Sequence, residues 1–316
     1  MRDPHFGVTM LVAVTGATGF VGRFIVEHLL RRDHDVRALV RNAEEAGSLR
    51  DRGVHVVPGD LEATAAMRDL AQGADALVHL VGIIEEIGRQ TYERVHVSGT
   101  RAVVEAARMG GVTRLVHMSA LGARFDEGAT AYHRSKAAGE EVVGSSGLRS
   151  AIMRPSLIAA PGNPVLATLV NMLRVSPLVP VIGNGLYQLQ PVAAEDVADA
   201  FVTAVEDRSI EGTFEIAGPE SLTYHQLLDQ LEEALGVRRR RVAVPVSVVR
   251  FAAYAGMVLP NLNPITPDQL QMLLEGNTTT RNALESVFGI KPRPFLEVAR
   301  EICAPWAATG AGAPVS

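Results

Sequence analysis

The sequence predicts an α/β protein: a doubly wound parallel sheet followed by a smaller C-terminal lobe. Three observations predict this class. Short apolar runs rich in β-branched residues alternate with longer helical patterns through the first half of the chain, which is typical of βαβ units. A turn with three glycines joins the first predicted strand to the first predicted helix. After Arg154 the alternation gives way to segments rich in proline, glycine and asparagine.

The first strand is predicted at residues 8–15 and the first helix at residues 20–32, where apolar positions recur at helical spacing. Further strands are predicted at residues 36–40, 54–57, 76–80, 114–118 and 150–154, and further helices at residues 63–71, 91–108 and 132–143. Parallel strands need crossover connections that are almost always right-handed, so this order places helices on both faces of the sheet.

The second half of the chain is predicted to complete the sheet and then to form the lobe. A helix at residues 194–205 and a strand at residues 213–216 rejoin the sheet. The lobe has helices at residues 224–235 and 267–274 and an isolated strand at residues 241–244. The predicted organisation is a sheet domain of residues 1–160 completed by 187–217, a lobe of residues 161–186 and 218–303, and a mobile tail of residues 304–316.

The composition is that of an ordinary globular protein. The chain has 316 residues, a net charge of −5 and an isoelectric point near 6.0, so no positive field favours a nucleic acid. The one cysteine, Cys303, excludes an intrachain disulfide. The first residues lack the pattern of a signal peptide, and the long uncharged runs are interrupted by proline and glycine. We expect a cytoplasmic protein without an integral membrane segment, and peripheral contact with the inner face of a membrane stays open.

The turn after the first strand has the spacing of a dinucleotide-binding turn of the Rossmann type. It consists of Gly16, Ala17, Thr18, Gly19, Phe20, Val21 and Gly22. Gly16 permits the tight turn, Gly19 lets the backbone approach a pyrophosphate, and Gly22 lets the helix pack closely on the strand. The phosphates then lie at the N-terminus of the helix. The position between a strand and an amphipathic helix favours this interpretation over a simple surface turn.

The end of the second predicted strand bears on which nicotinamide cofactor is bound. Enzymes that prefer NAD usually place an acid there to hold the ribose 2′-hydroxyl. Here the strand is followed by Arg41, whose guanidinium can pair with a 2′-phosphate, so NADP(H) is favoured over NAD(H). The alternative is that Arg41 is a solvated charge at a strand end.

Two further strand ends lead into the same crevice, because ligands of such sheets bind at the carboxyl ends of the strands. Asp60, followed by Leu61, can accept a hydrogen bond from the adenine amino group, or else serves only as a loop or capping residue. Leu80, Val81 and Gly82 offer backbone close to the adenosine ribose.

Three side chains form a candidate catalytic group. Tyr132 and Lys136 lie four residues apart on a predicted helix, so both project from the same face. A lysine in that place can lower the pKa of the phenol from about 10 and make it a general acid or base near neutral pH. Ser119, after the fifth strand, is expected to hydrogen-bond a substrate carbonyl or hydroxyl. The Tyr-x-x-x-Lys pattern is weak alone and becomes specific together with Ser119 and the glycine turn.

With these motifs the chain resembles a short-chain dehydrogenase/reductase of the extended or atypical kind, over nearly its whole length. The resemblance rests on residues 15–22, Gly59-Asp60-Leu61, His117-Met118-Ser119, Tyr132-His133-Arg134-Ser135-Lys136 and Arg154-Pro155-Ser156. Within that superfamily, residues 96–100, residues 117–122 and the proline-rich lobe are most similar to the group of the nucleotide-binding accessory subunit of respiratory complex I and its bacterial relatives.

The resemblance implies a reductase, epimerase or dehydratase in which Tyr132 exchanges a proton, the nicotinamide exchanges hydride, and Lys136 also holds the nicotinamide ribose. It further implies a cofactor contact at Pro155. Many extended members have asparagine where this chain has His96, which puts the proton relay and helix geometry supported by that asparagine in question. Two functions follow: an enzyme acting on a small carbonyl or hydroxyl compound, including a hydrophobic one, or a non-catalytic accessory or assembly protein of a respiratory complex.

Features outside this site allow alternative interpretations. Residues 238–241 are four arginines, which indicate a solvated edge or else a contact for a phosphate, an anionic lipid or an acidic partner. Residues 246–259 are almost wholly apolar and indicate a buried helix, or else a hydrophobic substrate pocket or a membrane contact. The nine histidines include no close pair with metal-ligand spacing and a matching acid, so no metal is expected.

Overall fold

The structure is a computed structural model and describes residues 8–258 and 265–307. The chain divides into two compact units. The first comprises Met1–Pro155, Glu195–Ile216 and Arg281–Ile290, and the second comprises Ser156–Ala194, Ala217–Thr280 and Lys291–Ser316. Residues 281–290, which the sequence prediction gave to the lobe, therefore lie in the first unit.

Within the described residues, the first unit contains a seven-stranded sheet in the order β11-β6-β5-β4-β1-β2-β3. All neighbours in it are parallel. The strands are β1 (Leu11–Thr15), β2 (Asp35–Val40), β3 (His55–Pro58), β4 (Ala76–His79), β5 (Arg114–Met118), β6 (Arg149–Pro155) and β11 (Gly212–Ile216). The predicted doubly wound sheet is confirmed, and β11 rejoins it as expected. The strand order reverses between β1 and β4, which is where ligands bind to such sheets.

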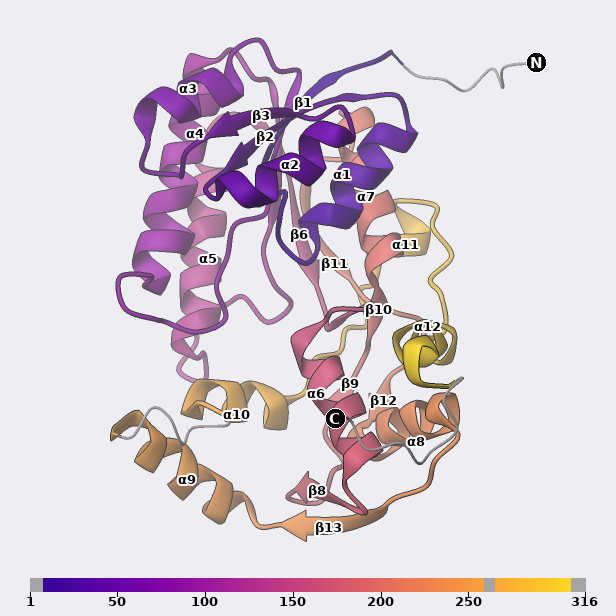
Figure 1. Ribbon diagram of the computed structural model, residues 1–316. Helices are drawn as coiled ribbons and strands as arrows, with labels where there is room; N and C mark the ends of the chain where they lie inside the picture. Colours follow the sequence, from indigo (N-terminus) through magenta and orange to yellow (C-terminus); the bar gives the residue numbers. More distant parts are fainter. Residues whose placement is uncertain (1–7, 259–264, 308–316) are drawn as a thin grey trace, which may run out of the picture. The chain divides into compact units, whose positions relative to one another are not determined.

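Helices cover both faces of this sheet. They are α1 (Gly22–Arg31), α2 (Ala43–Asp51), α3 (Thr64–Ala71), η1 (Glu93–Ser98), α4 (Gly99–Met109), α5 (Ala131–Gly144), α7 (Ala194–Glu206) and α11 (Ala283–Ser286). Figure 1 shows α3, α4 and α5 on one side of the sheet and α1, α2 and α7 on the other. Fully buried residues such as Leu70 and Val103 pack against Leu77 and Leu115 of the sheet. Burial of one such leucine contributes about 2 kcal/mol.

Two details of the first unit differ from the sequence prediction. Helix α2 was not predicted; Asn42 begins it by accepting a hydrogen bond from the backbone N–H of Glu44 at 3.0 Å. The helix expected at residues 91–108 is divided, because η1 is a π-helix and regular α-helix begins only at Gly99. Such π turns are rare and occur frequently at functional sites.

The second unit has short paired strands and helices around a separate core. Its elements are β7 (Ile158–Ala159), α6 (Pro164–Val175), β8 (Leu178–Ile182), β9 (Gln188–Leu189), β10 (Val192–Ala193), β12 (Leu222–Thr223), α8 (Tyr224–Leu235), β13 (Arg240–Val244), α9 (Val246–Val258), α10 (Pro267–Glu275) and α12 (Phe295–Ala307). Buried side chains of α6, α8 and α12, including Leu173, Leu227 and Phe295, form this core.

Several predictions for this unit were wrong. The strand expected to be isolated pairs in parallel with β8, a segment at which no strand was predicted. Residues 304–307 belong to α12 and not to a mobile tail, and residues 308–316 lie outside the described residues. Residues 246–258 do form a helix, but Phe251 is 77% exposed, so the helix is not buried throughout.

Candidate active site

The glycine turn has the geometry that a pyrophosphate requires. Gly16 has a φ of +78°, which favours glycine, and a Cβ on Gly22 would lie 2.1 Å from the carbonyl oxygen of Gly16. The first turn of α1 has no acidic residue and no side-chain cap. Among the described residues, the backbone N–H groups of Phe20, Val21 and Gly22 have no hydrogen-bond partner. The turn therefore fits an anion at the N-terminus of α1.

The loop after β4 joins this turn to the candidate catalytic group. The backbone N–H of Leu80 donates to Thr15 O at 3.1 Å, and a Cβ on Gly16 would lie 3.1 Å from Val81 N. A Cβ on Gly82 would lie 3.7 Å from Lys136 Nζ and 3.4 Å from His96 Nε2. The structure thus brings the predicted residues of β1, β4 and α5 to the same end of the sheet.

Lys136 is buried beside the end of β5. Its Nζ donates a hydrogen bond to the carbonyl oxygen of Met118 at 2.6 Å. Burial lowers the pKa of Lys136 to about 8, against a smaller opposing effect of the Glu140 carboxylate. The ammonium form therefore prevails at neutral pH and is lost as the pH rises through about 8.

Tyr132 is half-buried, and its ring meets those of Tyr92 and His96 edge-on, with centroids 5.9 and 5.8 Å away. Its hydroxyl has no hydrogen-bond partner among the described residues. Burial raises the pKa of the Tyr132 phenol above its ordinary range, and Tyr92 adds to this. The expected lowering by Lys136 is therefore absent here, because desolvation dominates and the lysine ammonium is directed to Met118.

Ser119 is buried and already has a partner. Its Oγ donates to the carboxylate of Glu140. Arg154 holds the same carboxylate from β6, with Nε 2.8 Å from Oε1 and Nη2 2.5 Å from Oε2. Since its proton is directed to Glu140, Ser119 can accept a hydrogen bond from a substrate hydroxyl more readily than it can donate one to a carbonyl. Glu140 was missed in the sequence, although it follows Lys136 by four residues on the same helix face.

His96 lies in η1, directly beside Tyr132. Its Nε2 accepts from the backbone N–H of Ile83 at 3.0 Å, so the ring proton is on Nδ1, which is 2.8 Å from Ser135 Oγ. That hydroxyl in turn donates to the carbonyl oxygen of Tyr132 at 2.8 Å. Burial, followed by the charge of Lys136, lowers the pKa of His96 to about 3 and keeps the ring neutral. His96 therefore ties the β4 loop to α5, a role that the sequence pattern did not suggest.

Two more histidines, on β4 and β5, are buried in the interior near Lys136. His79 and His117 are paired residues of adjacent strands, and their ring centroids are 5.2 Å apart. His79 is hydrogen-bonded to Thr15 and Thr100. Neither ring nitrogen of His117 has a partner among the described residues. Burial lowers the pKa of His79 to about 3 and that of His117 well below its ordinary value.

The remaining predicted residues lie at the ends of β2, β3 and β6. Arg41 is exposed and has no hydrogen bond or ion pair with any described residue. Asp60 Oδ1 accepts from the backbone N–H groups of Glu62 and Ala63, each at 3.0 Å, which is the role of a loop residue given above as an alternative. The Leu61 side chain packs on Gly99. Pro155 is buried, and its carbonyl accepts from Leu121 N at 3.0 Å.

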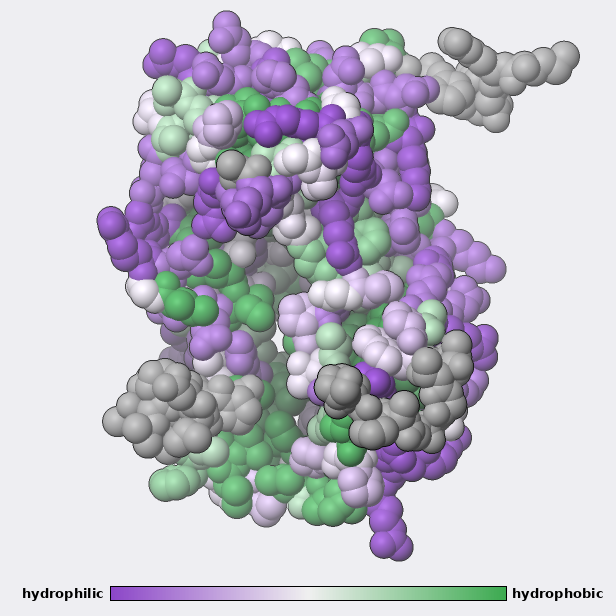
Figure 2. All heavy atoms as spheres, in the orientation of Figure 1, coloured by the Kyte–Doolittle hydropathy of each residue, from purple (hydrophilic) through white to green (hydrophobic). Residues whose placement is uncertain are grey.

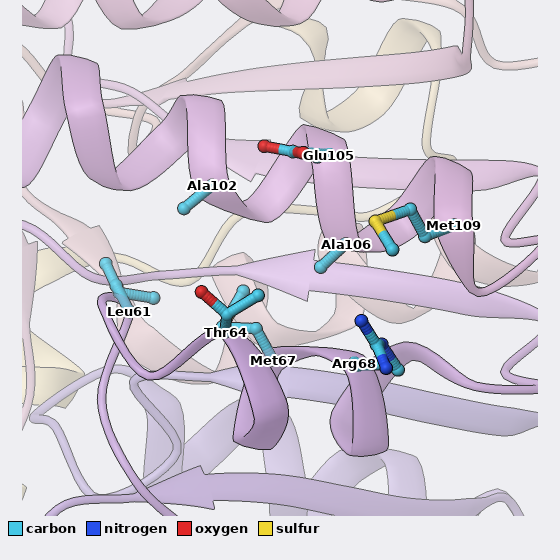
Figure 3. Close-up of a pocket in the computed structure, with 8 residues that line it drawn as sticks. All are labelled: Leu61, Thr64, Met67, Arg68, Ala102, Glu105, Ala106 and Met109. Carbon is cyan, nitrogen blue, oxygen red and sulfur yellow. The ribbon is translucent and has the colours of Figure 1, made fainter.

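A small hollow lies elsewhere on the first unit, between α3 and α4. Figure 3 shows side chains of the two helices directed toward one another across it, with Met67, Arg68 and Met109 among them, and Leu61 on the loop before α3. Leu61 is the one predicted site residue that lines it. Among residues 8–258 and 265–307, no three histidine, cysteine or acidic side chains are grouped as a metal site, and no helix is long and apolar enough to cross a membrane.

Comparison with known proteins agrees with this geometry. Ceramide reductase of Caulobacter vibrioides (strain NA1000 / CB15N) is 33% identical over 237 residues, which cover 74% of this chain and 74% of that protein. Mitochondrial NADH dehydrogenase (ubiquinone) 1 alpha subcomplex subunit 9 of Arabidopsis thaliana is 28% identical over 294 residues, or 87% of this chain and 72% of the subunit.

A solved structure supports the fold. Triphenylmethane reductase of Citrobacter sp. has a TM-score of 0.75 and 21% identity, and the match covers 93% of this chain and 99% of the reductase. The model of the NAD dependent epimerase/dehydratase family matches residues 12–217, which contain the glycine turn and the Tyr132 helix. The resemblance inferred from the motifs is thereby confirmed, and this chain belongs to the NAD dependent epimerase/dehydratase family.

Proposed function

We propose that this chain is an NADP(H)-dependent oxidoreductase that reduces the carbonyl group of a small hydrophobic compound or oxidises the corresponding alcohol. The proposal rests on Ser119 and Lys136, which lie at the end of β5, and on Tyr132, which lies one helical turn before Lys136 on α5. The nicotinamide ring supplies or takes up hydride when the cofactor is bound. The name of the Caulobacter relative, a ceramide reductase, supports a lipid-like substrate.

The side chains divide the proton chemistry between them. Tyr132 carries a proton at neutral pH, because burial raises its pKa, so it acts as the general acid toward a substrate carbonyl. For Lys136 to stabilise the phenolate that remains after the transfer, its ammonium group has to turn from the carbonyl oxygen of Met118 toward Tyr132. Ser119 accepts a hydrogen bond from the hydroxyl group so formed, since its own proton is held by Glu140. The protonated form of Tyr132 is the one that reduction of a carbonyl requires.

The proposed cofactor preference depends on Arg41. Its exposed guanidinium follows β2 and has no partner among the described residues, so it is available to a 2′-phosphate. No acid in the first turn of α1 repels the pyrophosphate, which NAD(H) and NADP(H) share. The position of Arg41 is the observation that supports NADP(H) in preference to NAD(H).

Replacement of Tyr132 by phenylalanine tests the catalytic role. Tyr132→Phe removes the proton donor and keeps the ring, so turnover of NADPH with a panel of aldehydes and ketones is expected to fall at least about 100-fold. The NADPH dissociation constant is expected to stay within about twofold. The matched control is Tyr92→Phe, which removes a hydroxyl that donates to Ile84 O and leaves the proton donor intact. A Tyr132→Phe enzyme with normal turnover would refute the mechanism.

A second candidate function is a nucleotide-binding accessory or assembly protein of a respiratory complex. The match to the Arabidopsis complex I subunit over 87% of this chain favours it. It predicts that NADPH is retained through purification, that the panel is not turned over, and that the chain copurifies with subunits of a membrane complex. Either function is compatible with a cytoplasmic protein that contacts a membrane peripherally.

A further inference from the structure

The second unit exposes apolar side chains on β8, β13 and α9. Leu178, Val242, Val248, Phe251 and Tyr254 are each between 45% and 77% exposed. In Figure 2, hydrophobic surface gathers over the elements that Figure 1 labels α9, β13 and β8. Exposed apolar residues are common singly, whereas a group of them on adjoining elements marks an interaction surface.

The pairing of β8 with β13 places apolar side chains on one face of a two-stranded ribbon. Leu178 is opposite Arg240, and Pro180 is opposite Val242. Side chains alternate between the faces of a strand, so these four share one face. The alternate residues of β8, Val179 and Val181, belong to the core on the other face.

Helix α9 follows this ribbon after Pro245 alone, and its side chains divide into a buried and an exposed side. Ala253 is fully buried. Val248, Phe251 and Tyr254 are spaced three residues apart and are exposed, and Arg250 is a neighbour of Tyr254 at four residues. An aromatic and aliphatic stripe bordered by a cation is the pattern of a helix that lies in a membrane interface.

Two of the arginines beside these residues have acidic partners and two do not. Arg241 and Arg238 have acidic partners in Asp229 and Glu232. The side chains of Arg240 and Arg250, by contrast, are exposed and have no hydrogen bond or ion pair with any described residue. The face therefore combines apolar side chains with two uncompensated positive charges.

We propose that the face formed by Leu178, Arg240, Val242, Val248, Arg250 and Phe251 docks on a lipid bilayer that contains anionic headgroups. The apolar side chains enter the acyl boundary, and the two arginines pair with headgroup phosphates. A second copy of the chain fits less well, because a symmetric contact would bring the uncompensated arginines of both copies together. All these residues lie in the second unit, so the proposal does not depend on the proposed activity.

Co-sedimentation of the full chain with vesicles tests this proposal. We expect the chain to bind phosphatidylcholine vesicles that contain phosphatidylglycerol. Binding is expected to be weaker with phosphatidylcholine alone and to decrease as the salt concentration rises. Arg240→Gln and Arg250→Gln are each expected to lower the partition coefficient on the order of fivefold. Phe251→Ser is expected to lower it roughly tenfold.

Matched controls come from the first unit. Arg101→Gln and Phe125→Ser make the same chemical changes at exposed positions and are expected to leave binding unchanged. Unchanged far-ultraviolet circular dichroism shows that each variant is folded. The proposal is overturned by the absence of vesicle binding, or by binding that the test variants and the controls reduce equally. It is also overturned if the test variants abolish a dimer seen by light scattering without vesicles and leave vesicle binding intact.

Discussion

Glu140 illustrates how one buried carboxylate can set the chemistry of a neighbouring side chain. Its carboxylate accepts hydrogen bonds from the Ser119 hydroxyl and from Nε and Nη2 of Arg154. Its charge also opposes the fall in the pKa of Lys136. The sequence predicted Ser119 and Lys136 as separate members of a pattern. Their connection through Glu140 could not be predicted, because it depends on a contact between α5 and the ends of β5 and β6.

Replacement of Glu140 by glutamine tests this connection. Glu140→Gln leaves the partly buried Arg154 without its counter-ion, so the free energy of unfolding is expected to fall by about 2 kcal/mol. Glu141→Gln, its exposed neighbour on α5, is the matched control and is expected to change stability by less than about 0.5 kcal/mol. Urea unfolding of the two variants measures both. Equal midpoints would contradict the account of Glu140.

Arg41 is the residue on which the cofactor preference depends. Arg41→Asp replaces a partner of the 2′-phosphate by a group that repels it, so NADPH affinity is expected to fall at least about tenfold. NADH affinity is expected to stay the same or to rise, because an acid can hold the 2′-hydroxyl. Fluorescence titration with both nucleotides measures the two affinities. An equal loss for both would show that Arg41 has no part in the preference.

At the scale of elements, the glycine turn and α1 show what a local pattern can predict. The spacing of Gly16, Gly19 and Gly22 has a steric cause that the sequence alone reveals, and the structure has the corresponding close contacts. The π-helix η1 has no comparable signal. It contains His96, whose bonds to Ile83 and Ser135 come from segments distant in the sequence. The partner strand of β13 was missed for the same reason, because its place depends on contacts between segments distant in the sequence.

The addition of a single methyl group at Gly22 tests the close packing of the glycine turn. Gly22→Ala places a Cβ against the Gly16 carbonyl oxygen, so α1 must shift, and both stability and nucleotide affinity are expected to fall, the affinity by more than about tenfold. Gly47→Ala in α2 is the matched control, since no atom lies within 4 Å of its new Cβ. That variant is expected to gain up to about 1 kcal/mol from helix propensity. Normal nucleotide binding by Gly22→Ala would contradict the close packing described here.

At the scale of the whole molecule, three neutral histidines in the interior link stability to pH. The pKa values of His79, His96 and His117 lie below their unfolded value of 6.5, so the unfolded chain takes up protons first as the pH falls. Protonation of these groups in the unfolded chain therefore does not affect stability well above pH 6.5 and lowers it as the pH falls below 6.5. At about pH 5.5 each histidine is expected to lower the free energy of unfolding by about 1 kcal/mol.

His117 is the best position at which to test this link, because both of its ring nitrogens lack a partner among the described residues. His117→Met removes an unsatisfied polar group, so stability at neutral pH is expected to rise by about 1 kcal/mol. The gain over the parent is expected to grow by about another 1 kcal/mol at pH 5.5. His55→Met, at an exposed position of β3, serves as the control. A gain that does not depend on pH would show that His117 does not titrate in this way.

Transfer of an isotope label from the cofactor tests the central claim most directly. The full chain is incubated with NADPH that carries deuterium at the reactive carbon of the nicotinamide, together with hydrophobic aldehydes and ketones, and the products are analysed by mass spectrometry. The account predicts an alcohol with one deuterium on the former carbonyl carbon, formed by the parent chain and lost in Tyr132→Phe at equal NADPH occupancy. Bound NADPH that transfers no label to any compound would contradict the enzymatic account and favour the accessory protein.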